Sequence, residues 1–176
     1  MKEKDIHKGR SQCFVAIDFE TADYGHDSAC SIAMILVEGE QIIERVHRLI
    51  RPPRHKFIFT DIHGITWKDV ADQPTFSELW PLFTQMLKNV DFFVAHNAIF
   101  DQSVLHSCCR VADLHPPRIP FKCTMELARR VLNLYPTKLP DVCRRLRIDL
   151  IHHNALSDAE ACAQIYIKLQ KSKKLR

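Results

Sequence analysis

Apolar and polar positions follow a strand-like period in the first part of the chain. The segment 13–18 is a nearly continuous apolar run that ends in Asp18, and it predicts a buried strand. The runs 31–37 and 41–50 flank the short segment Glu38-Gly39-Glu40. A short connection that contains Gly is typical of a β-hairpin, so we expect an antiparallel hairpin there.

A helical period dominates the rest of the chain, interrupted by short strands. The expected helices are 74–88, 98–111, 124–134, 139–146 and a long one, capped by Asn154, that ends near residue 169. In the second of these, Phe100 is expected on the apolar side. Strands are expected at 90–95 and 121–123, and a helical turn after 62–66. This order predicts an α/β fold, with a mixed sheet covered on both faces by helices.

The composition fits one globular domain. The chain has 176 residues, 46% of them hydrophobic, and no run of about 18 uncharged apolar residues occurs. The start, MKEKDIHKGR, lacks the apolar core of a signal peptide. We therefore expect a cytoplasmic protein with a flexible segment at 1–12, one domain at 13–170, a basic tail at 171–176 and no membrane association.

Charge and cysteine content narrow the classes of partner only slightly. The formal net charge of +4 allows a polyanionic partner without requiring one. The seven cysteines include no C-x-x-C pair, so neither a zinc centre nor a redox centre is indicated. Reduced, buried thiols are expected.

Two carboxylates end the first predicted strand with one residue between them. A strand directs Asp18 and Glu20 to the same face, roughly 7 Å apart. Two anions this close beside an apolar segment repel each other unless a cation lies between them. The pair is therefore a candidate divalent-metal site. The alternative is an edge strand whose acidic end enters solvent, and an isolated D-x-E pair favours that alternative.

A third carboxylate lies where a buried strand gives way to a helix. In the segment HNAIFD, Asn97 and Asp101 are four residues apart and share a helix face if the helix has already begun. A helix amino terminus favours a nearby anion, either Asp101 or a phosphate. The alternative is a helix start capped by Asn97, and this segment alone does not separate the two.

The fourth carboxylate, Asp158, follows two imidazoles at the start of the last helix. Taken alone, His152, His153 and Asp158 fit an ordinary hydrogen-bonded pair. All four carboxylates, however, lie at the ends of predicted elements, where a fold can gather distant residues. Four carboxylates and one histidine suit two hard cations and a base.

These segments resemble the motifs of the DnaQ-like, DEDDh-type 3′–5′ exonucleases, the family of the DNA polymerase III epsilon subunit and RNase T. DFET at 18–21, HNAIFD at 96–101 and His153 five residues before Asp158 match in order and approximate spacing, and IHGIT at 62–66 resembles a further signature. The resemblance covers residues 14–169. It implies a ribonuclease H-like fold, whose mixed five-stranded sheet has the DFET strand in the middle.

The resemblance also implies the chemistry. It assigns two Mg²⁺ ions, which Mn²⁺ can replace, to Asp18, Glu20, Asp101 and Asp158, and it assigns the general base to His153. The product would be a nucleoside 5′-monophosphate released from a 3′ end. The residues implied to hold the terminal nucleotide are Thr21, Ile62, His63, Asn97 and Phe100. His152 is one place out of register, so we expect it to flank the site.

The resemblance leaves the substrate open between DNA and RNA, in a context of DNA replication or repair. Single-stranded ends are favoured, because they can be splayed into a cleft and stacked on apolar side chains. No segment resembling a polymerase-binding tail follows the last predicted helix, which favours a stand-alone nuclease, and the oligomeric state is open. One alternative is a hydrolase of small nucleotides or dinucleotides. Another is a non-catalytic nucleic-acid-binding module, which would be expected to have lost a motif carboxylate, and none is missing here.

Overall fold

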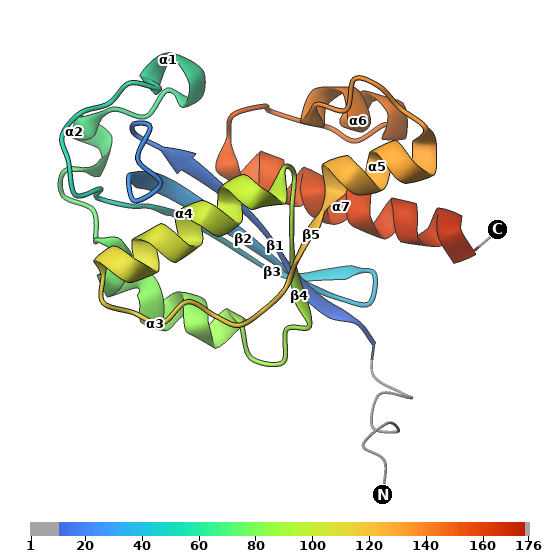
Figure 1. The fold of residues 1–176 in the computed structure, drawn as a ribbon, viewed down its shortest axis with the longest axis horizontal. Helices are drawn as coiled ribbons and strands as arrows, with labels where there is room; N and C mark the ends of the chain where they lie inside the picture. The colour runs from blue at the N-terminus through green and yellow to red at the C-terminus, as the bar shows by residue number, and fades with distance from the viewer. Residues whose placement is uncertain (1–10, 175–176) are drawn as a thin grey trace, which may run out of the picture.

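A five-stranded sheet forms the centre of the protein in a computed structural model that describes residues 11–174 (Figure 1). The strand order is β3-β2-β1-β4-β5, so β1 (Cys13–Thr21) is the middle strand. β1 pairs antiparallel with β2 and parallel with β4, and β4 pairs parallel with β5. The predicted mixed sheet and the central place of its first strand are confirmed.

The strands follow the predicted order with small differences in their bounds. The hairpin joins β2 (Ala29–Glu38) to β3 (Gln41–Leu49), and Gly39 in its turn has a φ of +62°, which glycine adopts without strain. β4 is Phe92–Ala95 and β5 is Phe121–Cys123. β1 runs past the predicted end at residue 18, so both of its carboxylates lie inside the strand.

Seven helices complete residues 11–174. They are α1 (Thr60–His63), α2 (Trp67–Val70), α3 (Phe76–Met86), α4 (Ala98–Val111), α5 (Thr124–Leu132), α6 (Leu139–Leu146) and α7 (Ala155–Lys174). α2 is the helical turn predicted after 62–66, whereas α1 was not predicted. α3 and α5 end two residues before their predicted ends, and α7 continues beyond residue 169, so that 171–174 of the expected tail are helical. Residues 1–10 and 175–176 of the expected terminal segments lie outside the described residues.

The alternation along β1 divides the core into two layers. Phe14 and Ala16 pack in the layer of α5, α6 and α7, whereas Val15 and Ile17 pack in the layer of α3 and α4. Figure 1 shows these two groups of helices on opposite sides of the sheet. Because side chains alternate with a period of two, the positions that continue the row of Phe14 and Ala16 are residues 18 and 20.

Small residues let α7 lie close against the sheet. Ala155, Ala159 and Cys162 are buried in the layer that contains β1, as predicted. Further along α7, the ring of Tyr166 meets that of Phe14 edge-on, with 5.0 Å between centroids. This packing brings the first turn of α7 to the end of β1.

The cysteines agree with the prediction of buried thiols. Within residues 11–174 no disulfide joins the seven cysteines, and six of them are buried. In the same part of the chain, no helix combines the length and apolar character that crossing a membrane requires.

Candidate active site

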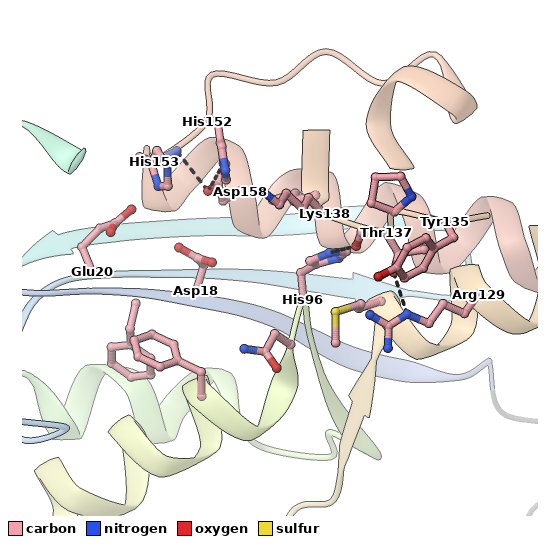
Figure 2. Close-up of a pocket in the computed structure, with 16 residues that line it drawn as sticks. Asp18, Glu20, His96, Arg129, Tyr135, Thr137, Lys138, His152, His153 and Asp158 are labelled. Atoms are coloured by element: carbon pink, nitrogen blue, oxygen red, sulfur yellow. Dashed lines mark hydrogen bonds and ion pairs between the residues drawn. The ribbon is translucent and has the colours of Figure 1, made fainter. Parts of the chain in front are cut away.

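Three carboxylates from the two ends of the chain converge at the end of β1. Oxygen atoms of Asp18, Glu20 and Asp158 lie within 4.8 Å of one another. Asp18 and Glu20 belong to the row of β1 that faces α7, and Asp158 comes from the first turn of α7 (Figure 2). The close packing of α7 therefore places residue 158 beside residues 18 and 20.

Asp101 joins them from the first turn of α4. Its side chain is buried, and its Oδ1 accepts a hydrogen bond of 3.1 Å from the backbone N–H of Phe19. Phe19 is the residue between the two carboxylates of β1, so this bond fixes α4 to the centre of the site. The structure thus brings all four predicted carboxylates together.

Burial and mutual repulsion raise the pKa values of these carboxyl groups. Burial is the largest cause for Asp18, whose pKa is held well above its usual value with further contributions from the other three carboxylates. Burial and then the charge of Asp158 raise the pKa of Glu20 to about 7. Burial also raises the pKa values of Asp101 and Asp158. The site therefore holds more negative charge than its own surroundings stabilise.

One oxygen of Asp158 shows how a cation fits this site. Oδ2 accepts a hydrogen bond of 3.1 Å from the backbone N–H of His153, whereas Oδ1 is buried and has no hydrogen-bond partner within residues 11–174. An unsatisfied buried acceptor is unfavourable by about 1–3 kcal/mol, and by more when it is charged. Carboxylate oxygens are the ligands that Mg²⁺ and Mn²⁺ prefer. The residues present fit a divalent cation.

The two histidines before α7 both border the carboxylates. A carboxylate only accepts hydrogen bonds, so Nδ1 of His152 donates to Oδ2 of Asp158, at 3.1 Å. The expectation that His152 merely flanks the site is therefore wrong. The register of the motif did not reveal this contact, because it depends on the direction of a side chain. The rings of His152 and His153 are stacked, with 3.8 Å between centroids.

The backbone and the pKa of His153 suit a proton acceptor. Its φ of +64° lies in the left-handed region, and this turn of the backbone lets its N–H reach Asp158. Partial burial and the neighbouring His152 lower its pKa, against an opposing effect of Asp158. The ring of His153 is therefore neutral near pH 7 and can accept a proton.

Four of the five predicted substrate-binding residues line one small pocket beside the carboxylates. The pocket has a volume of about 240 Å³, and the residues around it are Phe19, Glu20, Thr21, Phe59, Ile62, His63 and Phe100. His63 holds its wall in place, because its Nε2 donates to the backbone oxygen of Thr21 at 3.1 Å. The sequence reasoning missed Phe59, which no motif marks.

The structure differs from the prediction for Phe100 and from the capping alternative for Asn97. The prediction that Phe100 lies on the apolar, core-facing side of its helix is wrong, since the residue is 36% exposed. The buried face of α4 is centred on Asp101, Leu105 and Cys108, and Phe100 lies about a quarter turn from it. Asn97 makes no side-chain cap hydrogen bond, so it does not cap α4 in that way.

A larger pocket of about 640 Å³ contains most of the site. It includes Asn97 and Phe100 together with three of the carboxylates and both histidines. Beyond them it extends to His96, the first residue of HNAIFD, and to residues that no sequence motif marked: Met125, Arg129, Tyr135, Pro136, Thr137, Lys138 and Leu139. Only tertiary packing brings these residues to the site.

Comparison with known proteins gives a consistent family. The RNase_T exonuclease model matches residues 15–166. The chain is similar to the PolC-type DNA polymerase III of Thermotoga maritima, with 33% identity over 160 residues, 88% of this chain and 12% of that protein. It is also similar to that of Oceanobacillus iheyensis, with 33% identity over 162 residues, 89% of this chain and 11% of that protein. The chain thus spans about an eighth of the length of these relatives.

Solved structures of exonucleases have the same fold. Exonuclease X in complex with 5′ overhanging duplex DNA superimposes with a TM-score of 0.74 and 26% identity, over 92% of this chain and 93% of that one. Exonuclease I superimposes with a TM-score of 0.77 over 91% of this chain and 41% of that one, and at 16% identity this likeness shows the fold alone. The predicted ribonuclease H-like fold is confirmed.

The raised pKa of Glu20 predicts how the stability of the metal-free protein depends on pH. The folded chain keeps the proton up to about pH 7, whereas the unfolded chain releases it near the ordinary value of 4.5. The unfolded state therefore binds fewer protons in this window, and the free energy of unfolding falls as the pH rises from 4.5 to 7. Urea denaturation at several pH values in the presence of chelator measures this slope.

Glu20→Gln should make the slope shallower, and Glu44→Gln, at an exposed position of β3, is the matched control. Equal slopes for the wild type and Glu20→Gln would contradict the assignment.

Mn²⁺ should raise the melting temperature of the metal-free protein, because the carboxylate cluster exists only in the folded chain. At a concentration of about 100 times the dissociation constant, the gain in stability is about 2.7 kcal/mol. Thermal melts followed by circular dichroism measure the effect. Asp158→Asn should remove most of it, whereas Asp72→Asn, at an exposed position outside both pockets, should retain it. A melting temperature that Mn²⁺ leaves unchanged would count against a preformed metal site.

Proposed function

The chain belongs to the RNase_T exonuclease family, and from this membership we propose that it is a 3′–5′ exonuclease that releases nucleoside 5′-monophosphates. The observation that supports the proposal best is the convergence of four carboxylates, two buried and two half-buried, where one oxygen of Asp158 has no hydrogen-bond partner within residues 11–174. Without a cation the carboxylates repel one another, whereas with bound cations they form a site that can catalyse phosphodiester hydrolysis. The similarity to PolC-type polymerases supports a DNA substrate and a role in replication or repair.

The carboxylates would hold the metal ions of the reaction. Asp18, Glu20, Asp101 and Asp158 supply enough oxygen ligands for two Mg²⁺ or Mn²⁺ ions. When bound, such ions stabilise the negative charge that develops on phosphate oxygens. The hydrogen bond from Phe19 N–H and the bonds from the two histidine residues hold Asp101 and Asp158 in place for this role.

The other residues would position the substrate and move the proton. The small apolar pocket formed with Ile62 and Phe100 takes the terminal nucleoside, because these side chains are 49% and 36% exposed and can pack on a base or a sugar. His153 accepts a proton from the attacking water as the water oxygen bonds to phosphorus. The bond from phosphorus to the 3′ oxygen of the preceding nucleotide breaks, and that oxygen takes up a proton from solvent.

His152 would act through its neighbours. Its Nδ1–H holds the carboxylate of Asp158, and its ring lies against that of His153, so it restricts the orientation of both. We therefore treat it as a positioning residue and His153 as the base.

With Mg²⁺ and 5′-labelled single-stranded DNA or RNA, the purified protein should give a ladder of products shortened from the 3′ end. Comparing the two ladders gives the sugar preference. Asp18→Ala should abolish the ladder, because that carboxylate lies at the centre of the metal site, and Asp72→Ala is the matched control. Full activity in excess EDTA would contradict the metal requirement. Release of the 5′ label as a mononucleotide would contradict the direction of attack.

Replacing His153 with Ala should lower the turnover rate by about 10²- to 10⁴-fold. The acidic limb of the pH–rate profile should flatten, because the group that must be neutral to accept a proton is lost. Stabilisation by Mn²⁺ should change little.

His152→Ala is the comparison variant. It should cause a smaller loss of turnover and retain the acidic limb, since it removes a hydrogen bond and leaves the base. If His152→Ala flattens the limb and His153→Ala turns over at a near-normal rate, the base is His152.

A further inference from the structure

The larger pocket extends well beyond the carboxylates. Figure 2 shows the carboxylates with His152 and His153 at one end, and Arg129, Tyr135, Thr137 and Lys138 at the other. The smaller pocket shares Phe19, Glu20 and Phe100 with the larger one, but it continues toward α1. The carboxylates therefore lie between the small apolar pocket and the part of the larger pocket that reaches the α5–α6 loop. A strand cut at its last phosphodiester bond needs this layout, because the terminal nucleoside and the preceding nucleotides lie on opposite sides of the scissile phosphate.

The loop at the far end, between α5 and α6, is fixed in position. Thr137 is 2% exposed, and its backbone oxygen accepts a hydrogen bond of 2.9 Å from Nε2 of His96. Its hydroxyl accepts one of 2.7 Å from Nε of Arg129. His96 directly follows β4 and begins the segment that carries Asp101, so the loop and the carboxylates are attached to the same strand end. A loop held in this way needs little ordering when a ligand binds.

Two side chains of this loop are left without a structural role. Tyr135 is 85% exposed, so the core does not explain its aromatic ring. Lys138 is exposed and makes no ion pair or side-chain hydrogen bond within residues 11–174. Both line the larger pocket, and Figure 2 shows the side chain of Lys138 pointing from the loop toward its centre. The exposed ring of Tyr135 and the ammonium group of Lys138 thus lie on either side of Thr137, which is buried and held by two hydrogen bonds. Aromatic rings and cations are the two kinds of group that bind single-stranded nucleic acid.

We propose that Tyr135 and Lys138 form the subsite for the nucleotides that precede the scissile bond. Lys138 binds a backbone phosphate and Tyr135 stacks on a base. The inference rests on the proposed exonuclease function and adds a direction to it, from the Ile62 side for the terminal nucleoside to the α5–α6 loop for the rest of the strand. Stacking requires an unpaired base but does not depend on its identity, so the subsite selects single-stranded ends of any sequence.

The test compares two substrates that differ in the part the subsite would hold. Oligothymidylate has preceding nucleotides, whereas the p-nitrophenyl ester of thymidine 5′-monophosphate has none. For Tyr135→Ala, the KM for oligothymidylate relative to that for the ester should rise by about 5- to 150-fold, which corresponds to the stacking of one base. Because stacking needs only an aromatic ring, Tyr135→Phe should restore the ratio. The kcat at saturating oligothymidylate should change much less than KM.

The salt dependence of kcat/KM tests Lys138. If Lys138 binds one phosphate of a single strand, Lys138→Ala should make the plot of log kcat/KM against log salt shallower by about 0.7 for oligothymidylate. Lys88→Ala is the matched control, because Lys88 is exposed after α3 and lines neither pocket, and it should leave the slope as in the wild type.

The outcomes separate the subsite from the function. The first outcome is that the wild type hydrolyses both substrates, while Tyr135→Ala has the KM ratio of the wild type and Lys138→Ala has its salt slope. That outcome would overturn the subsite and leave the proposed exonuclease function standing. If both variants raise KM equally for ester and oligothymidylate, the loop shapes the site as a whole and the proposal is wrong. If the wild type hydrolyses neither substrate, the proposed function fails and the subsite fails with it.

Discussion

Repulsion among four carboxylates at the end of one strand is the constraint on which the site depends. Asp18 and Glu20 face α7 because the pleat of β1 continues from a buried, apolar row. Asp158 can approach them only because alanines let α7 lie close to the sheet, and Asp101 is fixed by a backbone N–H of the same strand. The fold therefore uses its apolar burial to hold charges together that would separate in water. Burial and repulsion by neighbouring carboxylates accordingly raise the pKa values of Asp18 and Glu20.

Both walls of the site are tied to the sheet by polar contacts. On one side, the Arg54 guanidinium binds the carboxylates of Asp23 and Asp27 and lowers the pKa of Asp23 to about 2. This clamp joins the segment before α1 to the loop after β1. On the other side, His96 holds the α5–α6 loop through Thr137. The site is thus bordered on both sides by segments that are themselves restrained.

The sequence predicted those features of the site that follow from hydrophobic periodicity and from the order of the motifs. The two-residue alternation of β1 was enough to place Asp18 and Glu20 together, and the helix starts were enough to locate Asp101 and Asp158. It did not predict that His152 is the histidine whose side chain contacts Asp158, or that Phe100 is exposed, because both depend on side-chain directions near the start of a helix. Nor did it identify the α5–α6 loop, whose residues reach the site only through tertiary packing. No local pattern distinguishes such a loop from an ordinary surface turn.

The position of Asp158 on α7 has a consequence for protein synthesis. Translation runs from the amino to the carboxyl terminus, so β1 with its two carboxylates emerges before the other strands and helices of residues 11–174. α7 is the last element of residues 11–174, and it packs with α5 and α6 in one layer of the core as well as completing the site. A nascent chain that lacks α7 has neither the metal cluster nor a closed core. The four carboxylates of the site therefore come together only after the messenger RNA has been translated through this helix.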